Sequence, residues 1–460
     1  MNENQHGFRA KRSCLSQLIA HYELILEALE CNASVDVIYL DFSKAFDKVD
    51  HGILMQKLKK FNITGEIGIW IHNFLLNRTQ QVTVEKCLSS ESQVLSGVPQ
   101  GSVLGPLLFL ILLADIDQDI NSSAVSSFAD DTRFLKKIEK FLDTQLLQQD
   151  LNTVYEWSKR NNMVFNSEKF EGITYTAPSI NSVQRTYQAD DESEITMKEH
   201  IKDLGVTMSN DAGFGEHIKT IVRTAKNKLG WILRTFRTRD KLSMLTLWKS
   251  LVRPTLDYCC QLWSPISIGK IQEIESLQRT FTSKIDEVRH LNYWERLEAL
   301  NLYSLERRRE RYIIIYIWKI LNNHVPNIGI TMRQSDCRGP TCNVRAIETR
   351  ALGSIKTKIS ASLLVKGCQL FNEMPPGIRR MAGVSVLSFK NALDKHLSAI
   401  PDQPKLPGYS LAAENNSLLK QIPARRYNML SQSTAPVQRG RSTALTTSGM
   451  PPASRDSAAR

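Results

Sequence analysis

Apolar residues recur at three- and four-residue intervals from residue 14 to residue 30, and this spacing predicts an amphipathic helix. A continuous apolar run from Val35 to Leu40 follows and is typical of a buried strand. The same criteria predict helices near 51–60, 65–76, 103–114 and 143–160, and paired strands at 80–85 with 93–95, at 124–128 with 132–135, and within 201–208. Strands and helices that alternate in this way indicate an α+β fold.

The pattern changes after residue 214. Up to residue 321, apolar side chains keep helical spacing almost without interruption, as in the series Leu242, Leu245, Leu247, Trp248, Leu251 and the later series Leu302, Leu305, Tyr312, Ile313, Tyr316. Residues 401–460 contain seven of the sixteen prolines and many Ser, Thr and Ala residues, a composition that favours a disordered tail. The chain therefore divides into a mixed first part, a helical middle part and a tail.

Carboxylates and a Gly/Pro loop occur where this pattern places turns. Asp41 directly follows the first predicted strand, and Asp130 and Asp131 lie in a predicted hairpin turn. Between them stands the loop 96–101, Ser-Gly-Val-Pro-Gln-Gly, whose glycines allow the backbone to approach a ligand closely. Because aspartate is common in turns and caps, each acid alone predicts only a turn. Together they predict a two-metal nucleotidyl-transfer site, since Mg²⁺ prefers oxygen ligands and leaves positions for phosphates.

Composition narrows the class of protein. Lys and Arg number 59 against 47 Asp and Glu, and the net charge of +12 favours a polyanionic partner. The eight cysteines lack the dense, regular spacing of a secreted disulfide framework, which favours a reducing compartment. The apolar stretches are too short to span a bilayer, and the N-terminus lacks a signal-peptide pattern. These features predict an intracellular protein of the nucleus or cytoplasm, without a membrane partner.

Four stretches of the sequence carry a resemblance to a known family. They are Gln5-His-Gly-Phe-Arg9, Val35-Asp-Val-Ile-Tyr-Leu-Asp41 continuing to His51, Ser96-Gly-Val-Pro-Gln-Gly101 continuing to Phe109, and Phe128-Ala-Asp-Asp131. In this order and at these separations, the chain resembles the reverse transcriptase of non-LTR (LINE-type) retrotransposons. The resemblance covers roughly residues 5 to 320 and is weaker beyond.

The resemblance implies a right-hand polymerase of α+β class, with a palm, partial fingers, a helical thumb and a disordered C-terminal tail. We place the fingers remnant and palm at 1–207, the thumb at 208–322, a C-terminal helical region at 323–400 and the tail at 401–460. Family members usually carry more fingers and an endonuclease domain upstream. We therefore expect an N-terminally truncated element, whose remaining basic fingers residues are Arg9, Lys11 and Arg12.

The resemblance also assigns catalytic roles. By position in the matching motifs, Asp41 and Asp130 would hold two Mg²⁺ ions, or Mn²⁺ in their place, with Asp131 as a supporting metal ligand. Lys169 matches the lysine that protonates the leaving pyrophosphate, but Phe170 follows it where the family usually has Thr, and a solvated surface lysine is the competing interpretation.

Nucleotide contacts are implied for Phe42, Phe46, Gln100 and Gly101. Phe46 matches the aromatic residue that closes the sugar pocket, where a ring excludes the ribose 2′-hydroxyl and so selects deoxynucleotides. A core phenylalanine is the competing interpretation of Phe46. Gln100 matches a residue that contacts the incoming nucleotide and template in related palms.

Two clusters outside these motifs leave alternatives open. The arginines at 307–309 are predicted either to follow a phosphate backbone or to form a solvated surface run. The spacing of Cys337 and Cys342, with His324 and Cys368 at a distance, fits a zinc knuckle or finger poorly. The tryptophans of the helical part are expected mainly in the core: Trp231, Trp248, Trp263, Trp294 and Trp318.

The predicted function is RNA-directed DNA polymerisation, with an RNA template, a DNA primer and dNTPs as partners. The alternative is a nucleic-acid-binding remnant of such an element with weak or no catalytic activity. The acids and aromatic residues of the motifs favour the enzyme, whereas the short fingers region favours the remnant.

Overall fold

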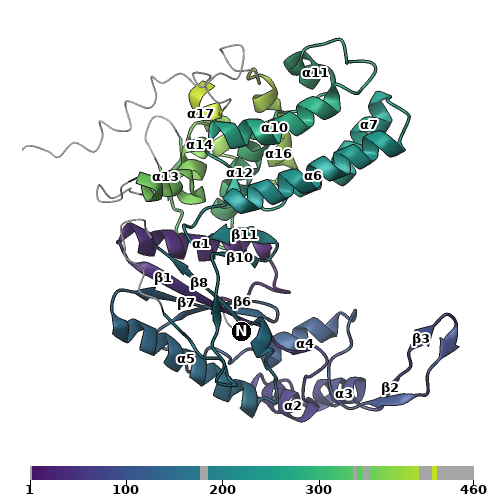
Figure 1. Cartoon of the computed structure of the whole chain (residues 1–460), viewed down its shortest axis with the longest axis vertical. Helices are drawn as coiled ribbons and strands as arrows, with labels where there is room; N and C mark the ends of the chain where they lie inside the picture. Colours follow the sequence, from purple (N-terminus) through teal and green to yellow (C-terminus); the bar gives the residue numbers. More distant parts are fainter. Residues whose placement is uncertain (1–2, 177–184, 335–338, 346–352, 403–416, 422–460) are drawn as a thin grey trace, which may run out of the picture.

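The computed structural model describes residues 3–176, 185–334, 339–345, 353–402 and 417–421. Two lobes lie one above the other in Figure 1. The sheet lobe is built from the described residues up to 209, and the helical lobe from those after 214. Most of the predicted tail, and Cys337, lie outside the described residues.

A five-stranded sheet forms the centre of the sheet lobe. Its strands run in the order β6 (Ala124–Phe128), β7 (Asp131–Ile138), β1 (Ser34–Leu40), β8 (Glu171–Tyr175) and β9 (Thr196–Met197). Neighbouring strands are antiparallel except β8 and β9, which are parallel. The strand predicted at 35–40 is thus the central strand, and the predicted pair 124–128 and 132–135 forms the hairpin β6–β7.

Alternation along β1 explains how helices cover both faces of the sheet. Val35 and Val37 belong to one apolar cluster with helix α1 (Cys14–Glu30), whereas Ile38 and Leu40 belong to a second cluster with α4 (Leu104–Leu112) and α5 (Phe141–Arg160). All four side chains are at most 3% exposed. The predicted helix at 14–30 is confirmed with the same bounds.

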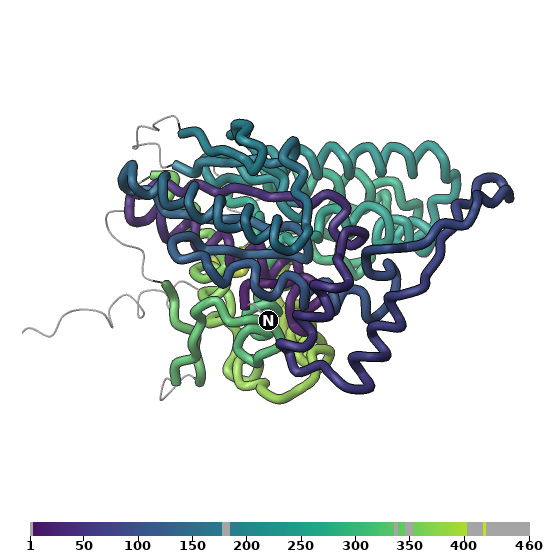
Figure 2. Tube along the Cα trace, turned by 90° about the horizontal axis from the view of Figure 1, so that it is seen from below, coloured from purple at the N-terminus to yellow at the C-terminus, as the bar shows by residue number. Residues whose placement is uncertain are grey.

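An arm projects from the sheet lobe beyond α2 (His51–Lys60) and α3 (Gly65–Leu75), as Figure 2 shows. Its stem pairs β2 (Arg78–Gln80) with β5 (Ser92–Val94), and its tip pairs β3 (Thr83–Val84) with β4 (Cys87–Leu88). The single strand predicted at 80–85 is therefore wrong. Positive φ angles at Glu85 and Lys86 close a tight second hairpin within that stretch.

The helical lobe continues from a last hairpin, β10 (His200–Asp203) with β11 (Val206–Ser209). Its first helices are α6 (Gly215–Thr235), α7 (Lys241–Leu247), a π-helical turn (Trp248–Val252), α8 (Arg253–Asp257), α9 (Cys260–Trp263), α10 (Ile268–Thr282), α11 (Tyr293–Ala299) and α12 (Leu305–Leu321). The predicted helical region is confirmed but is more often interrupted than expected. One interruption lies at Cys259, whose φ of 50° ends the preceding helical path.

The remaining elements are β12 (Met332–Arg333), β13 (Thr341–Cys342), α13 (Gly353–Ala361), a second π-helical turn (Leu363–Gly367), α14 (Cys368–Asn372), α15 (Pro376–Arg379), α16 (Val386–Ser398) and α17 (Leu418–Gln421). Of these, α14, α16 and the second π-helical turn pack against α12, and α13 packs against α1. Trp318 of α12 stacks on Phe389 of α16 with ring centroids 4.4 Å apart. Among the helices of the described residues, none has both the length and the apolar character needed to cross a bilayer.

Candidate active site

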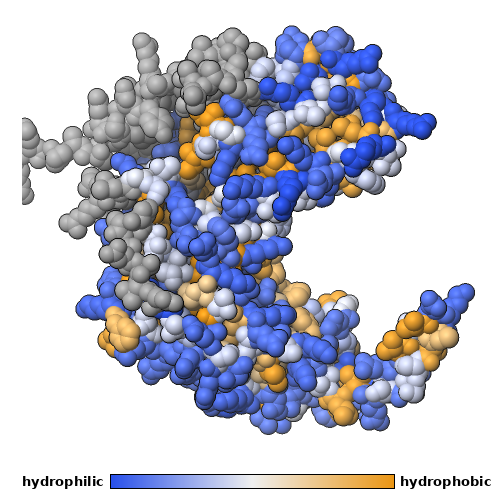
Figure 3. All heavy atoms as spheres, in the orientation of Figure 1, coloured by the Kyte–Doolittle hydropathy of each residue, from blue (hydrophilic) through white to orange (hydrophobic). Residues whose placement is uncertain are grey.

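The ends of β1 and β7 bring the three predicted aspartates to one edge of the sheet. The last pair of the β1–β7 ladder joins Leu40 to Thr132. Asp41 and Asp131 therefore stand beside each other on adjacent strands, and Asp130 occupies the turn before β7. This edge faces the hollow that Figure 3 shows between the two lobes.

Burial and neighbouring negative charge raise the pKa values of Asp130 and Asp131. Burial raises the pKa of Asp130, and the negative charge of Asp41 raises it further. The pKa of Asp131 is also raised, first by partial loss of solvent and then by the charge of Asp130, although part of this residue remains exposed. Carboxylates that destabilise one another in this way gain stability when a cation binds between them.

Lys169 supplies one such cation. It ends a 3₁₀ turn (Ser167–Lys169), and its Nζ donates to Asp41 Oδ2 at 2.9 Å. The backbone of Asn166 donates to the carbonyl oxygen of Asp41, which fixes the turn against the end of β1. The hydrogen bond to Asp41 raises the pKa of Lys169, so this exposed ammonium keeps its proton at neutral pH.

Phe46 lies half-buried beside the carboxylates' strand end. Its ring stacks on Phe109 of α4 with centroids 4.4 Å apart, and the exposed Phe8 meets its edge at 6.1 Å. Phe46 is therefore anchored on one side by the core and open on the other. This half-anchored placement differs from that of an ordinary core phenylalanine.

The loop 96–101 docks against the segment that contains Phe46. Val98 donates its backbone N–H to the Phe46 carbonyl, and Gln100 Nε2 donates to Asp47 Oδ1 at 2.9 Å. A Cβ on Gly97 would lie 2.8 Å from the Asp47 backbone, so only glycine fits this contact. Gly101 has a φ of 80° and open space around its Cα. The structure thus brings Gln100 and Gly101 to the same side of the site as Phe46.

Phe42 is the one predicted nucleotide contact whose side chain points away. It is 3% exposed and stacks on Phe165 with ring centroids 4.4 Å apart. Because the ring is buried in the core, only the backbone of Phe42 could contact a nucleotide bound beside Asp41. Its side chain therefore adds stability rather than a ligand contact.

The carboxylates fit an octahedral cation that keeps part of its shell for other ligands. Within the described residues, no three acidic, His or Cys side chains are grouped closely enough to form a protein-only metal cage. Mg²⁺ is commonly bound by one or two carboxylates together with substrate phosphates and water. Two hard oxygen donors with raised pKa, close to each other and open to the hollow, match that mode of binding.

The cysteine cluster of the helical lobe lies apart from this site. Cys342 and Cys368 are both buried, and their mutual hydrogen bond raises the pKa of Cys342. His324 stacks against Trp318 instead of approaching them. Cys337 lies outside the described residues.

The arginine run on α12 is buried, and both sequence interpretations of it are wrong. Arg307 and Arg309 are 0% and 2% exposed. Arg308 forms a two-pronged ion pair with Asp257, its Nε and Nη2 lying 3.0 and 2.8 Å from the two carboxylate oxygens. Arg307 lies 3.9 Å from Asp402, so Arg307 and Arg308 both have carboxylate partners on other segments and are part of the packing of the lobe.

A basic, solvent-exposed face lies instead on α6. Lys219, Arg223, Lys226 and Arg234 repeat at three-, four- and eight-residue spacing and share one side of the helix. The opposite side is buried through Ile218, Val222, Ala225, Leu229 and Ile232. In Figure 1, α6 runs along the edge of the helical lobe that faces the hollow, and Figure 3 shows hydrophilic residues along this edge. Trp231 of this helix is 49% exposed, whereas Trp248, Trp263 and Trp318 are buried.

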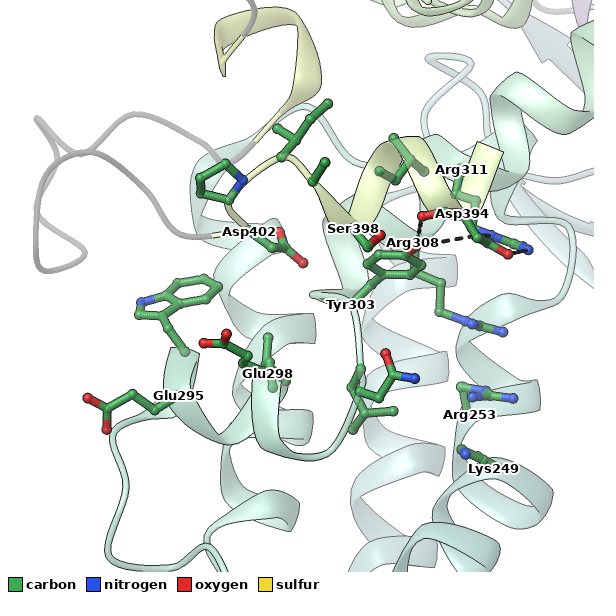
Figure 4. Close-up of a pocket in the computed structure, with 18 residues that line it drawn as sticks. Lys249, Arg253, Glu295, Glu298, Tyr303, Arg308, Arg311, Asp394, Ser398 and Asp402 are labelled. Atoms are coloured by element: carbon green, nitrogen blue, oxygen red, sulfur yellow. Dashed lines mark hydrogen bonds and ion pairs between the residues drawn. The ribbon is translucent and has the colours of Figure 1, made fainter. Parts of the chain in front are cut away.

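A separate cavity of about 910 Å³ lies in the helical lobe between α11, α12 and α16 (Figure 4). Lys249, Arg253 and Arg311 line one side of it, and Glu295 and Glu298 lie across from them. Asp41, Asp130 and Asp131 do not line this cavity, so it lies apart from the candidate active site at the sheet edge.

Sequence reasoning missed two residues that contact the site. The side chain of Gln5 binds the backbone of Ala129, the residue before Asp130, although its motif was noted only for the resemblance. Arg133, 1% exposed on β7, forms an ion pair with Asp203 of the β10–β11 hairpin. A charged residue inside the apolar strand after Asp131 was the available signal for Arg133.

The sequence of the chain is similar to that of known polymerases. Residues 1–208 match the model of the family described as reverse transcriptase (RNA-dependent DNA polymerase). The chain is 29% identical over 290 residues to the RNA-directed DNA polymerase from mobile element jockey of Drosophila melanogaster, covering 60% of this chain and 31% of that protein. It is 31% identical over 289 residues to the probable RNA-directed DNA polymerase from transposon X-element of the same species, with the same coverage of 60% and 31%.

A more distant relative is the Pol polyprotein from the type-1 retrotransposable element R2 of Popillia japonica, 26% identical, with 56% of this chain and 43% of that protein covered. Among solved structures, a Candida tropicalis telomerase with a fragment of telomeric RNA matches at a TM-score of 0.37 and 11% identity, covering 82% of this chain and 52% of that one. The chain spans about a third of the length of the jockey and X-element proteins.

Proposed function

We propose that the chain is an RNA-directed DNA polymerase of the non-LTR retrotransposon type, whose active site is the sheet edge at Asp41 and Asp130. The match of residues 1–208 to the reverse transcriptase family and the similarity to the jockey and X-element polymerases support this proposal. The observation that carries the proposal is the convergence of Asp41 and Asp130 from adjacent strand ends beside the loop 96–101. The reaction is attack of a primer 3′-hydroxyl on the α-phosphate of a dNTP, with release of pyrophosphate.

The carboxylates would hold the metal ions of the reaction. Reverse transcriptases generally use divalent metal ions, and Asp41 and Asp130 are the residues we assign to two Mg²⁺ ions, with Asp131 in support. Bound Mg²⁺ would activate the attacking hydroxyl and neutralise charge that develops on the phosphates. The ammonium of Lys169, held on Asp41 with its proton, is positioned at the site to donate to the leaving phosphate oxygen.

Phe46 would set the choice of sugar. Its anchored ring borders the site on the side of Gln100 and Gly101, where the incoming nucleotide is expected. A ring fixed by Phe109 cannot swing away from a 2′-hydroxyl, so the ribose form clashes and the deoxyribose form fits. This gives DNA as the product.

We assign the RNA template and DNA primer to the hollow between the lobes. The sheet lobe then acts as palm with a fingers remnant at 1–207, and the region 208–322 as thumb. The basic face of α6 supports this assignment, because four exposed cations share one side of a helix that borders the hollow.

Primer extension tests the proposal. The chain is incubated with an RNA template, an annealed DNA primer, dNTPs and Mg²⁺. We expect extension that a chelator abolishes and that Asp41→Asn lowers at least about a thousandfold, because several kcal/mol of charge stabilisation are lost. Asp119→Asn, on an exposed surface pair with Arg160, is the matched control and keeps full activity.

Two outcomes contradict the proposal. Extension by Asp41→Asn at the wild-type rate would remove the sheet edge as the active site. A wild-type chain that binds template and primer but never extends the primer would identify a nucleic-acid-binding remnant.

A further inference from the structure

The chain segment before α1 runs along the free edge of the catalytic hairpin. β6 is the outermost strand of the sheet, and residues 4–6 lie beside it as a short parallel addition. The backbone of His6 donates to the Ser127 carbonyl at 2.9 Å, and that of Ser127 donates to the Asn4 carbonyl at 3.1 Å. These contacts place Gln5 directly beside the turn that carries Asp130.

Beyond the end of the backbone ladder, the side chain of Gln5 forms the hydrogen bonds to the backbone of residue 129. Its Nε2 donates to the carbonyl of Ala129 at 3.1 Å, and its Oε1 accepts the Ala129 N–H at 2.9 Å. The same Oε1 accepts the N–H of Gly7 at 2.7 Å. The amide orientation is unambiguous, because a flipped amide would point its NH₂ at two N–H donors.

Ala129 needs such a partner. Its φ of 56° is left-handed, a conformation that costs free energy for any residue with a Cβ. Ala129 is also 6% exposed, so water does not satisfy its backbone polar groups. The Gln5 amide provides both a donor and an acceptor to this strained residue, directly before Asp130.

Gly7 completes the contact by leaving room for it. A Cβ at position 7 would lie 2.3 Å from the Ala129 nitrogen and 2.9 Å from its Cα, closer than nonbonded atoms approach. The backbone of Ala129 would therefore have to move, and Asp130 with it. Glycine at this position permits the close packing of the two segments.

We infer that Gln5 and Gly7 are positioning residues for catalysis: they hold Ala129 in its left-handed conformation and thereby aim Asp130 at Asp41. This inference rests on the proposed polymerase function. Neither residue touches the reacting atoms. Their effect reaches the reaction only through the geometry of the turn at residues 129–131.

The test compares Gln5→Ala with Gln145→Ala, an exposed glutamine of α5 far from the turn. We expect Gln5→Ala to lower the rate of single-nucleotide incorporation at saturating dNTP about 10- to 100-fold, the effect of losing two hydrogen bonds that hold the reactive geometry. The KM for dNTP stays nearly unchanged, because Phe46 and Gln100 are not disturbed. Hydrogen exchange at residues 124–135 becomes faster, while the rest of the sheet keeps its protection.

A rescue separates positioning from general folding. Ala129→Gly should restore part of the rate lost in Gln5→Ala, because glycine adopts the left-handed conformation without a clamp. In the wild-type background the same change should have little effect. Gly7→Ala should reproduce the loss, with Gly377→Ala as its control, since a Cβ at Gly377 meets no atom within 4 Å.

Two results would overturn the inference. One is Gln5→Ala with the same exchange rates and incorporation rate as Gln145→Ala. The other is a loss of rate that Ala129→Gly does not restore at all, which would make Gln5 an ordinary part of the fold. If wild-type protein incorporates no nucleotide, the polymerase proposal fails, and hydrogen exchange at residues 124–135 still decides whether the clamp exists.

Discussion

The sheet edge and helix α12 both carry several like charges that are partly or fully removed from solvent. The two regions differ in whether charges of opposite sign compensate them. On α12, carboxylates from other segments match the arginines: Asp257 binds Arg308 and Asp394 binds Arg311. At the sheet edge, burial and then the negative charge of neighbouring carboxylates raise the pKa of Asp130 and of Asp131.

The difference separates charges that stabilise the fold from charges that await a ligand. In a buried ion pair, each charge is compensated by its partner. Removing one partner leaves the other charge buried and uncompensated, which lowers the stability of the fold. A group of like charges lowers the stability of the fold until a ligand of opposite charge binds. Such groups are therefore common at functional sites. Charge compensation within the structure therefore distinguishes the α12 arginines from Asp130 and Asp131, which we propose act in catalysis, although both groups are conspicuous in the sequence.

The largest expected effect of breaking an ion pair is at Arg308 and Asp257. Arg308→Gln leaves Asp257, 19% exposed at its side chain, with a 3.5 Å contact to Arg253 and a 3.3 Å hydrogen bond from the Tyr312 hydroxyl. We expect the free energy of unfolding to fall by about 2–3 kcal/mol, measured by urea denaturation. Arg289→Gln, in an exposed pair with Asp286 at 3.7 Å, is the control and should change it by less than about 0.5 kcal/mol. Equal effects of the two substitutions would show that the α12 pair is no more than a surface pair.

Glu23 is an intermediate case, paired yet dominated by burial. Burial raises its pKa to about 7, although Arg345 opposes this with an ion pair at 3.2 Å. Because the folded pKa exceeds the unfolded value, the stability from this group is fully present below about pH 4.5 and is lost as pH rises through about 7. The loss approaches about 3 kcal/mol at about 1.4 kcal/mol per pKa unit.

Replacing Glu23 by Gln removes this titration. We expect the difference in unfolding free energy between wild type and Glu23→Gln to change between pH 5 and pH 8, with wild type losing ground as pH rises. Chemical denaturation at several pH values measures it. A difference that stays constant with pH would mean that Arg345 keeps Glu23 ionised throughout.

The α6 face tests whether cations without buried partners act on nucleic acid. Changing Arg223, Lys226 and Arg234 together to Gln should weaken binding of a template–primer duplex and make the slope of log affinity against log salt shallower by about one unit per lost contact. Lys59, Lys60 and Lys140, exposed on other faces of the sheet lobe, form the control set. An unchanged slope in the α6 variant would place the duplex elsewhere.

The smallest expected effect concerns sugar choice. Phe46→Ala removes the ring stacked on Phe109 and opens volume where a 2′-hydroxyl would lie. We expect incorporation of ribonucleotides relative to deoxynucleotides to rise about tenfold or more, as is typical when a pocket loses a steric block. Competition between labelled rNTP and dNTP measures the ratio. An unchanged ratio in a folded, active variant would return Phe46 to a core role.

Local patterns in the sequence predicted much of the sheet lobe. Apolar periodicity located α1 and β1, and the strand-end positions of Asp41 and Asp130 followed from the same pattern. What it could not predict depends on contacts between distant segments. The partner of Arg308 is 51 residues away, and Gln5 lies 124 residues from Ala129. Neither burial of the arginines nor the clamp on Ala129 leaves a signal in the residues nearby.

The prediction for the tip of the arm was wrong for a different reason. Its strands are two residues long, and the second turn needs left-handed Glu85 and Lys86, residues without turn preference. Short strands carry too few alternating positions to show a register. The Gly/Pro loop, by contrast, was predicted correctly from its glycines. Gly97 and Gly101 both adopt the positive φ that glycine favours.

Single-nucleotide incorporation by wild type and Asp130→Asn is the most direct test of the central claim that the aspartates at the sheet edge form the active site. Both proteins are first titrated with the same RNA template and DNA primer to establish equal affinity. One labelled dNTP is then added with Mg²⁺, and the rate of primer extension is measured in a single turnover. The account predicts extension by wild type, and for Asp130→Asn equal template binding, unchanged or higher thermal stability, and a rate at least about a thousandfold lower. A rate in Asp130→Asn equal to that of wild type would contradict it.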